Sequence, residues 1–229
     1  MRRIKRLAAG LIAVAGLLAF ALSTASASTI GGHQISDTFK GTTIDPTIWA
    51  FFGGNDEPAV SISQGGGALR FRIAANAGSD FFESATTRCS VAGDFDAQLT
   101  FELPQWTPNN GVWLMLMAAN TGGFNVYRAS WQFTPGDSYG AYLPPSGGAT
   151  APAETGNSGT IRLTRTGSTW TGYYQVRNTW VSLGSGPGPT NPVQLSVGVN
   201  NNSGVIPFAG NPTTIDVDRF RATADSIVC

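Results

Sequence analysis

The sequence predicts an all-β protein, an antiparallel β-sandwich of two sheets with a jelly-roll arrangement. Short stretches of alternating polar and apolar residues recur along the chain and are bounded by Gly, Pro, Asn and Ser, which is the pattern of half-buried strands. Few stretches carry helical periodicity after the N-terminal segment. The 29 Gly and 13 Pro residues supply turns between many short strands, as sandwiches and jelly rolls require.

Eight segments are expected to form strands. In chain order they are 68–73, 95–103, 111–118, 124–133, 160–165, 169–176, 193–199 and 214–222. Alternation in the second of them places Phe95, Leu99 and Phe101 on the core side, while a turn is expected at Gly93. The stretches 144–158 and 182–192 are rich in Pro and Gly and are expected to be surface loops.

The third and fourth segments predict central strands. In the third, both alternating sets are apolar, with Trp113 and Met115 on one face. In the fourth, Tyr127 and Trp131 share one face. A strand with two apolar faces is either buried on both sides or forms the floor of a ligand cleft.

The fifth and sixth segments predict a hairpin around Gly167-Ser168, a pair that suits a tight turn. Alternation places Ile161 and Leu163 on the inward face of the first strand. On the second strand it places Trp170 inward, so we expect this side chain to serve packing and not ligand binding.

Residues 1–27 have the three-part layout of a secretory signal peptide. Four basic residues precede the apolar run 7–22, and Ala25-Ser26-Ala27 fits an A-x-A cleavage site. The run is short for a membrane span, and no basic stop-transfer cluster follows it. We therefore expect a secreted, extracellular protein with a flexible N-terminal segment at 28–34 and one β-sandwich domain over 35–229.

Charge and composition exclude several functions. Without the leader, ten Lys and Arg oppose fourteen Asp and Glu, a net charge of −4. Such a chain has no electrostatic footprint for nucleic acid or an anionic membrane, so neither is an expected partner. The single histidine, His33, and the lack of a G-x-S-x-G motif disfavour serine-hydrolase chemistry. One His and two Cys are too few for a typical zinc site.

Cys89 and Cys229 are the two cysteines. An even pair in an exported chain usually forms a disulfide, so we predict a bridge between them that closes a long loop. Free thiols and an intermolecular bridge are the alternatives.

Two terminal segments resemble the first and last strands of concanavalin A-like lectins and glucanases. ISDTFKGTTIDPTIW (35–49) carries an Asp-x-Phe and an Asp-Pro-x-x-Trp, and TTIDVDRFRATA (213–224) carries the closing Asp-x-Phe-Arg. Between them, GALRFRIAANAGSDFF, GDFDAQLTF, IRLTRTGSTWTGYY and VQLSVGVNN resemble the group's middle strands in the expected order. The resemblance implies a concanavalin A-like jelly roll whose glycan, if any, binds on the concave face or its rim loops.

The resemblance does not extend to the catalytic motif. Glucanases of this group place carboxylates in a Glu-x-Asp-x-x-Glu strand, whereas none of the four Glu residues here has an Asp two positions later. The pairs Asp94/Asp96 and Asp216/Asp218 are expected to be solvated or structural. A polysaccharide lyase would use Tyr, His, Lys or Arg, but the mature chain has one His and one Lys, Lys40. We therefore predict no catalytic residues.

Glycan binding is the function that the residues support. Sugars stack their apolar faces on aromatic rings, and a few polar groups fix their orientation. Trp106 is of particular interest, because its Asn- and Pro-rich surroundings predict an exposed loop. The candidate binding residues are Trp106, Trp113, Tyr127, Trp131, Asn55, Asp56, Asn110 and Asn201.

A structural calcium ion is the one cofactor that the sequence leaves open, because Asp oxygens suit Ca²⁺ and related jelly rolls often hold one. Asp37, Asp216 and Asp218 would be its ligands if the terminal strands pair.

We expect a secreted monomer that binds an extracellular polysaccharide without cleaving it. Two alternatives stay open. One is a glycoside hydrolase or polysaccharide lyase of the same fold, and the other is an extracellular structural or protein-interaction module.

Overall fold

The computed structural model describes residues 29–31, 33–53, 59–78, 80–131, 136–145, 148–153, 156–201 and 208–229. All regular structure in these ranges is β-strand, which confirms the predicted fold class. No helix long and apolar enough to cross a membrane occurs in this part of the chain. The signal peptide expected at 1–27 lies outside the described residues and stays a prediction.

Fifteen strands make up the described fold. Their bounds are β1 Thr29–Gly31, β2 Gln34–Asp37, β3 Trp49–Gly53, β4 Val60–Gly65, β5 Ala68–Ile73, β6 Phe82–Gln105, β7 Trp113–Ala118, β8 Asn125–Ser130, β9 Asp137–Tyr142, β10 Thr150–Pro152, β11 Ser158–Thr166, β12 Thr169–Val176, β13 Thr179–Pro187, β14 Val193–Asn200 and β15 Thr213–Val228.

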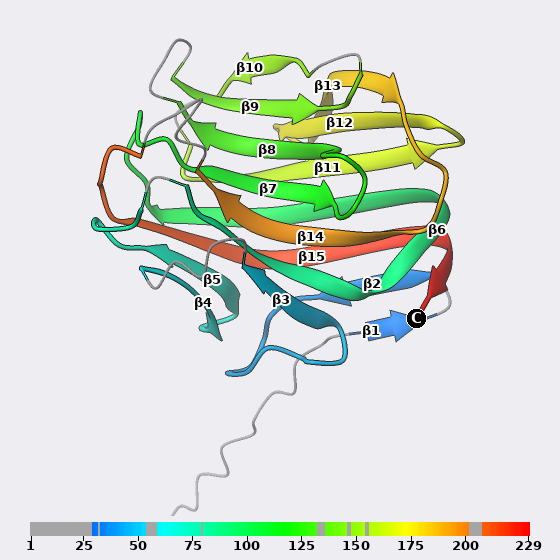
Figure 1. Ribbon diagram of the computed structural model, residues 1–229, viewed down its shortest axis with the longest axis horizontal. Coiled ribbons are helices and arrows are strands. Elements are labelled where there is room, and N and C mark those ends of the chain that lie inside the picture. The colour runs from blue at the N-terminus through cyan, green and yellow to red at the C-terminus, as the bar shows by residue number, and fades with distance from the viewer. Residues whose placement is uncertain are drawn as a thin grey trace, which may run out of the picture.

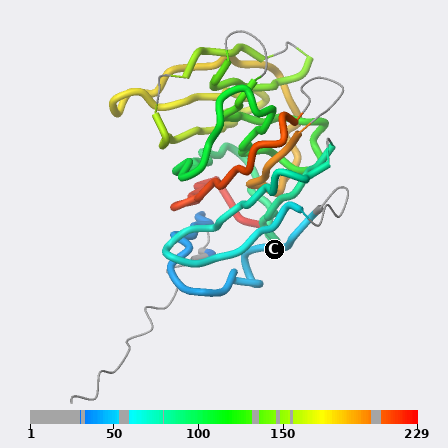
Figure 2. Tube along the Cα trace, turned by 90° about the vertical axis from the view of Figure 1, so that its left-hand side faces the viewer, coloured from blue at the N-terminus to red at the C-terminus, as the bar shows by residue number. Residues whose placement is uncertain are grey.

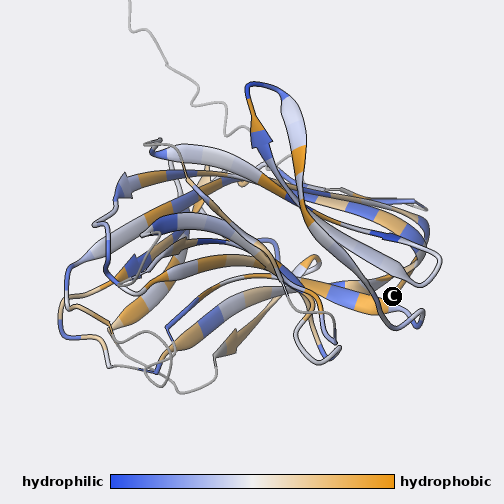
Figure 3. Ribbon diagram, turned by 90° about the horizontal axis from the view of Figure 1, so that it is seen from above, coloured by the Kyte–Doolittle hydropathy of each residue, from blue (hydrophilic) through white to orange (hydrophobic). Residues whose placement is uncertain are grey.

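The strands form two antiparallel layers, seen one behind the other in Figure 1 and from above in Figure 3. The front layer has the order β3–β6–β14–β7–β8–β9–β10, and the back layer has the order β1–β2–β15–β6–β11–β12–β13. β5 extends the back layer along the first part of β15, and β4 pairs with β5. The layers are continuous with each other because β6 belongs to both.

β6 changes layers near Gly93, which corrects the expected turn at this glycine. Ser90 and Val91 pair with β14 on one side and with β15 on the other, and from Phe95 onward the strand pairs with β11 and β15. Gly93 has a φ of 73°, and a Cβ there would lie 2.3 Å from Asp225 Oδ2. A glycine is therefore needed both for the backbone conformation and for the close approach of β15.

Two of the expected loops contain strands. β10 lies within 144–158, and most of β13 lies within 182–192. Both strands are at sheet edges, because β10 pairs with β9 and β13 pairs with β12 in the described residues. Pro and Gly are tolerated in edge strands, so these stretches resemble loops in composition while they extend the sheets.

The core fills the space between the layers. The predicted inward residues Phe95, Leu99, Phe101 and Trp170 are buried, the last with no exposed surface. A Cβ at Gly172 on β12 would lie 2.7 Å from Ala141 Cβ on β9, which shows how closely the two layers approach. The alternation in the sequence therefore assigned the core faces of β6 and of the β11–β12 hairpin correctly.

The terminal segments pair as the sequence predicts. β2 pairs with β15, with Asp37 opposite Phe220, and Trp49 packs against Phe220 with ring centroids 5.0 Å apart. In Figure 2 β15, in red, runs between the blue N-terminal strands and the rest of the molecule. The segment 28–34 was expected to be flexible, but Thr29–Gly31 forms β1 and pairs with β2.

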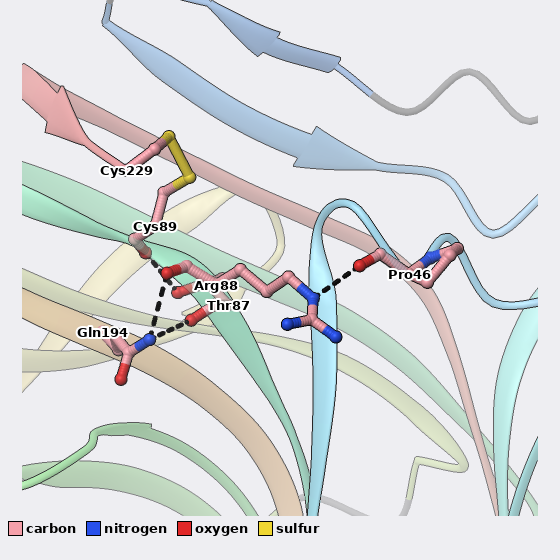
Figure 4. Close-up of a disulfide and its surroundings, with 6 residues drawn as sticks. All are labelled: Pro46, Thr87, Arg88, Cys89, Gln194 and Cys229. Carbon is pink, nitrogen blue, oxygen red and sulfur yellow. Dashed lines mark hydrogen bonds between the residues drawn. A yellow bond between two sulfur atoms is a disulfide. The ribbon is translucent and has the colours of Figure 1, made fainter.

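The predicted disulfide between Cys89 and Cys229 is present and joins residues 140 positions apart. Figure 4 shows the hydrogen bonds around the disulfide. Gln194 on β14 donates from Nε2 to the carbonyls of Thr87 and Arg88, and Arg88 donates to the carbonyl of Pro46. The bridge therefore links the end of β15 to the part of β6 that lies in the front layer.

Candidate functional site: an aromatic cleft on the front layer

The face of the front layer that points away from the core carries a groove of about 380 Å³, beside the β7–β8 loop. We call this face, between β3 and β9, the front cleft. Cross-strand register places Ser84, Gly198, Met115, Tyr127 and Gly140 side by side on this face, and we call this row the floor. Ser84 also lines the groove itself. Five strands therefore contribute one residue each to the floor.

Glycines shape this floor. A Cβ at Gly140 would lie 2.3 Å from Cζ of Tyr127, and one at Gly198 would lie 2.8 Å from Cβ of Ser84. Both distances are too short for real atoms, so larger residues at these positions would displace the floor. The Tyr127 ring lies across Gly140, and burial raises the pKa of its hydroxyl to about 12, so the phenol stays protonated at neutral pH.

Three of the predicted binding residues meet at one end of the cleft. Trp113 stacks on Tyr127 with ring centroids 4.8 Å apart, and Trp131 lies 5.1 Å from Trp113 and 6.3 Å from Tyr127. Together with Met115 and Ala129 they form an apolar cluster separate from the main core. The sequence placed Tyr127 and Trp131 on one face, and strand pairing brings Trp113 to them.

The rim of the cleft carries aromatic residues that the sequence did not identify. Phe52 on the edge strand β3 is 61% exposed and contacts Phe82 edge-on, with ring centroids 6.2 Å apart. Tyr142 on β9 is 47% exposed, and a Cβ at Gly123 would lie 3.0 Å from its ring. Alternation within β3 could have assigned Phe52 to a face, but only the pairing of β3 with β6 places that face in the cleft.

Several polar atoms of the cleft are buried without a hydrogen-bond partner among the described residues. They are Nε1 of Trp113, Nε1 of Trp131 and Oδ1 of Asn125. Buried polar atoms nearly always have a partner in native structures, which is often an ordered water. The two indole N–H groups can therefore donate further hydrogen bonds, and the Asn125 oxygen can accept one.

The groove of the front cleft is uncharged over its described lining. The side chains that line it are aromatic, aliphatic, hydroxyl or amide groups, and none is Asp, Glu, His, Lys or Arg. Arg88 lies further along the same face of β6, beyond Thr86, and donates to the Pro46 carbonyl. Arg128 on β8 points the other way, into the core, where it donates to Asp137 Oδ2 at 2.7 Å. The described cleft therefore offers stacking and neutral hydrogen bonds.

The other predicted binding residues that are described have structural contacts. Trp106 is half-buried and not exposed as expected, because its Nε1 donates to Asp137 and Arg128 lies over its ring. Asn110 and Asn201 are buried, and their side-chain amides donate to Thr213 Oγ1 and to the Gly111 carbonyl. These bonds fix loops at the ends of the sheets. Asn55 and Asp56 lie outside the described residues.

The proposed calcium ligands Asp37, Asp216 and Asp218 do not gather into one cluster in the described structure. Asp37 accepts hydrogen bonds from the Phe39 amide and from Trp49 Nε1, and Asp216 forms an ion pair with Arg70. Within the described ranges no three His, Cys, Asp or Glu side chains lie close enough together to hold an ion. Protein donors thus already satisfy two of the three carboxylates, and the calcium hypothesis gains no support.

The two carboxylate pairs on strands have similar roles. Asp96 forms an ion pair with Arg162, and Asp94 accepts a hydrogen bond from the Gly167 amide. These residues and the pair Asp216/Asp218 lie on the back layer and not in the front cleft.

Comparison with solved structures identifies the architecture. LamAcat from Zobellia galactanivorans superposes with a TM-score of 0.61 at 11% identity, covering 84% of this chain and 98% of that one. The fold is that of a glucanase-type jelly roll. A pseudo β-1,3-glucanase and immunostimulatory antigen of Mycobacterium tuberculosis (TM-score 0.59, 16% identity, 85% and 100% covered) has the same jelly roll.

A putative β-glucanase of Mycobacterium abscessus also shares the glucanase-type jelly roll (TM-score 0.57, 15% identity, 83% and 100% covered). The sequence itself matches no protein-family model and no curated protein. At these identities the likeness establishes the jelly-roll fold alone, so the residues of the front cleft have to be interpreted on their own.

Proposed function

We propose that the protein is a secreted carbohydrate-binding protein that holds an extracellular polysaccharide in the front cleft without cleaving it. The observation that carries the proposal is the lining of the cleft, which is aromatic and uncharged in its described part. Sugar rings stack on exposed aromatic faces, and a few polar groups orient them. The disulfide is compatible with an extracellular protein.

The lining also supports binding over hydrolysis. Retaining glycosidases need two carboxyls about 5–5.5 Å apart, and inverting ones need them about 6.5–9.5 Å apart. The described floor has Ser84, Met115 and Tyr127 where such groups would have to reach the sugar. Among the structural neighbours, the protein from M. tuberculosis is itself described as a pseudo-glucanase.

The test compares two exposed apolar side chains. Phe52 lines the groove of the front cleft, whereas Val228 lies at the end of β15, is 50% exposed and does not line the groove. We expect Phe52→Ala to weaken binding to the best polysaccharide of a panel about tenfold, equivalent to about 1.4 kcal/mol, and Val228→Ala to have no effect. Pull-down and calorimetric titration measure the affinity, and thermal melts verify folding.

Two results would overturn the proposal. Failure to bind any polysaccharide would reject carbohydrate binding and leave the protein-interaction alternative. Release of reducing ends or unsaturated products by the purified protein would reject non-cleaving binding and favour a hydrolase or lyase.

A further inference from the structure

The back layer carries an arginine held between two aromatic rings on its outer face. Arg162 on β11 donates from Nε and Nη2 to the two carboxylate oxygens of Asp96 on β6, at 3.0 and 2.6 Å. Its Cζ lies 5.1 Å from the ring centre of Tyr173 and 5.2 Å from that of Trp180. We call these four residues the outer arginine site.

The contacts of Arg165, the next arginine on β11, have a clear role in packing, whereas those of Arg162 do not. Arg165, on the opposite face of β11, is buried and donates to the carbonyls of Gly93 and Asn191, so it fastens loops to the core. In the described structure Arg162 donates hydrogen bonds to Asp96 on β6 and to no loop, and 24% of its side chain is exposed. A surface ion pair adds only about 0–1 kcal/mol to stability, so the fold has little need of this arrangement.

The site is preorganised for a ligand. Two hydrogen bonds and two rings fix the plane of the guanidinium, and fixed groups lose little entropy when they bind. Within the described structure Nη1 makes no hydrogen bond, so that side of the fork remains available as a donor. A groove of about 390 Å³ adjoins it, lined in part by Thr164 and Thr223.

Charge selects the kind of ligand. Asp96 neutralises Arg162, and the same groove is lined by the buried Arg165 and by two further carboxylates, Asp94 and Asp225, which leaves an excess of one negative charge. An anionic ligand would be repelled by these groups, and a cationic one would meet the guanidinium. A neutral molecule with adjacent hydroxyls fits both halves of the pair, because its oxygens can accept from Nη1 and its hydroxyl hydrogens can be donated to Asp96.

We propose that the outer arginine site is a second saccharide-binding site, specific for neutral sugars with adjacent hydroxyls. Tyr173 and Trp180 supply the aromatic surface, and the Arg162–Asp96 pair supplies the directed hydrogen bonds. The site lies on the back layer, on the opposite side of the molecule from the front cleft. It needs no ligand in that cleft, and together the two sites would let one molecule hold two polysaccharide chains.

The experiment is an NMR titration of the intact protein with neutral hexasaccharides of glucose, mannose, galactose and xylose. The indole N–H signal of Trp180 is assigned by its loss in Trp180→Ala. We expect at least one sugar to shift this signal, and to do so equally in Phe52→Ala. Arg162→Gln should weaken this binding at least tenfold, while Arg177→Gln, an exposed arginine at the β12–β13 turn, should leave it unchanged.

The outcomes separate the two sites. If the Trp180 signal does not move with any of these sugars at millimolar concentration, the second site does not exist. If the shifts disappear in Phe52→Ala, all binding belongs to the front cleft and the outer site is rejected. If Phe52→Ala weakens cleft binding about tenfold and the Trp180 shifts persist, both sites are supported independently.

Discussion

At the scale of single residues, Asp218 on β15 has the most perturbed carboxyl group in the described structure. Its pKa is raised to about 6, chiefly because burial disfavours the charged form and also because Glu102 and Asp216 repel it. The unfolded value is about 3.9. Between about pH 4 and 6 the folded state therefore binds more protons than the unfolded state, so stability falls as the pH rises through this range.

Replacing Asp218 by Asn should remove this pH dependence. We expect Asp218→Asn to raise the free energy of unfolding at pH 7 by about 1 kcal/mol, a figure reduced for the partial solvent exposure of the group. Urea denaturation from pH 4 to 8 measures the effect. Glu102→Gln, which removes one repelling neighbour, should act in the same direction but less. If the stability of Asp218→Asn fell more steeply between pH 4 and 6 than that of the parent protein, Asp218 would not be the group responsible for the pH dependence.

Some of the candidate binding residues could be predicted from the sequence, and others could not. Alternation within one strand is visible in the sequence, and it grouped Tyr127 with Trp131 correctly. Phe52 and Tyr142 escaped notice because their place in the cleft depends on pairing between distant strands. The composition around Trp106 indicated an exposed loop, but the indole donates to Asp137, the half-buried ion-pair partner of Arg128, a contact that no local pattern reveals.

At the scale of elements, the β11–β12 hairpin is held to the core by Trp170. Its ring packs against Phe95 and Phe124 at 5.2 and 4.7 Å between centroids, and its Nε1 donates to the Pro189 carbonyl. The turn agrees with the predicted Gly167-Ser168 pair, and Gly167 has a φ of 57°. The hairpin is thus anchored to β6, to the residue that precedes β8 and to the β13–β14 loop.

Replacing Trp170 by alanine should lower the stability of the protein as much as other truncations of large core side chains do. We expect Trp170→Ala to lower the free energy of unfolding by about 3–5 kcal/mol, measured by urea denaturation. Thr169→Ala, on the exposed face of the same strand, is the matched control and should change stability by less than about 0.5 kcal/mol. If Trp170→Ala is as stable as the parent protein but binds glycan less well, the faces of β12 have been assigned the wrong way round.

The length of β6 could not be predicted from the sequence pattern. The segment 95–103 was expected as a separate strand, yet β6 runs from Phe82 to Gln105 because Gly93 bends the strand without ending it. A glycine between two alternating stretches suggests a turn equally well. Only the partners on either side, β14 before the bend and β11 after it, distinguish the two cases.

At the scale of the whole molecule, the disulfide closes a loop that contains most of the fold. Chain-entropy arguments give about 5 kcal/mol for a loop of this length. We expect the double variant Cys89→Ser/Cys229→Ser to lose about 2–5 kcal/mol in urea denaturation, and a reductant to destabilise the parent protein but not the variant. Equal stability of the parent and the variant would show that the bridge adds nothing.

The overall architecture was predictable because the opening and closing segments carry complementary patterns that pair as β2 and β15. The number of strands was not predictable, since β1, β10 and β13 are short or rich in Gly and Pro and are recognisable only by the neighbours they pair with. Tertiary pairing, which local pattern does not encode, supplies the remaining strands.

The central place of β15 has a consequence for how the protein is made. A ribosome synthesises β2, β5 and β6 long before β15, yet β15 pairs with all three. Contacts so distant along the chain form slowly, and the early strands meanwhile expose unpaired edges that favour aggregation. A truncated chain that ends before Thr213 would therefore lack the strand that joins these elements. We expect such a chain not to form a smaller stable domain, so the fold forms only when the whole chain has been synthesised.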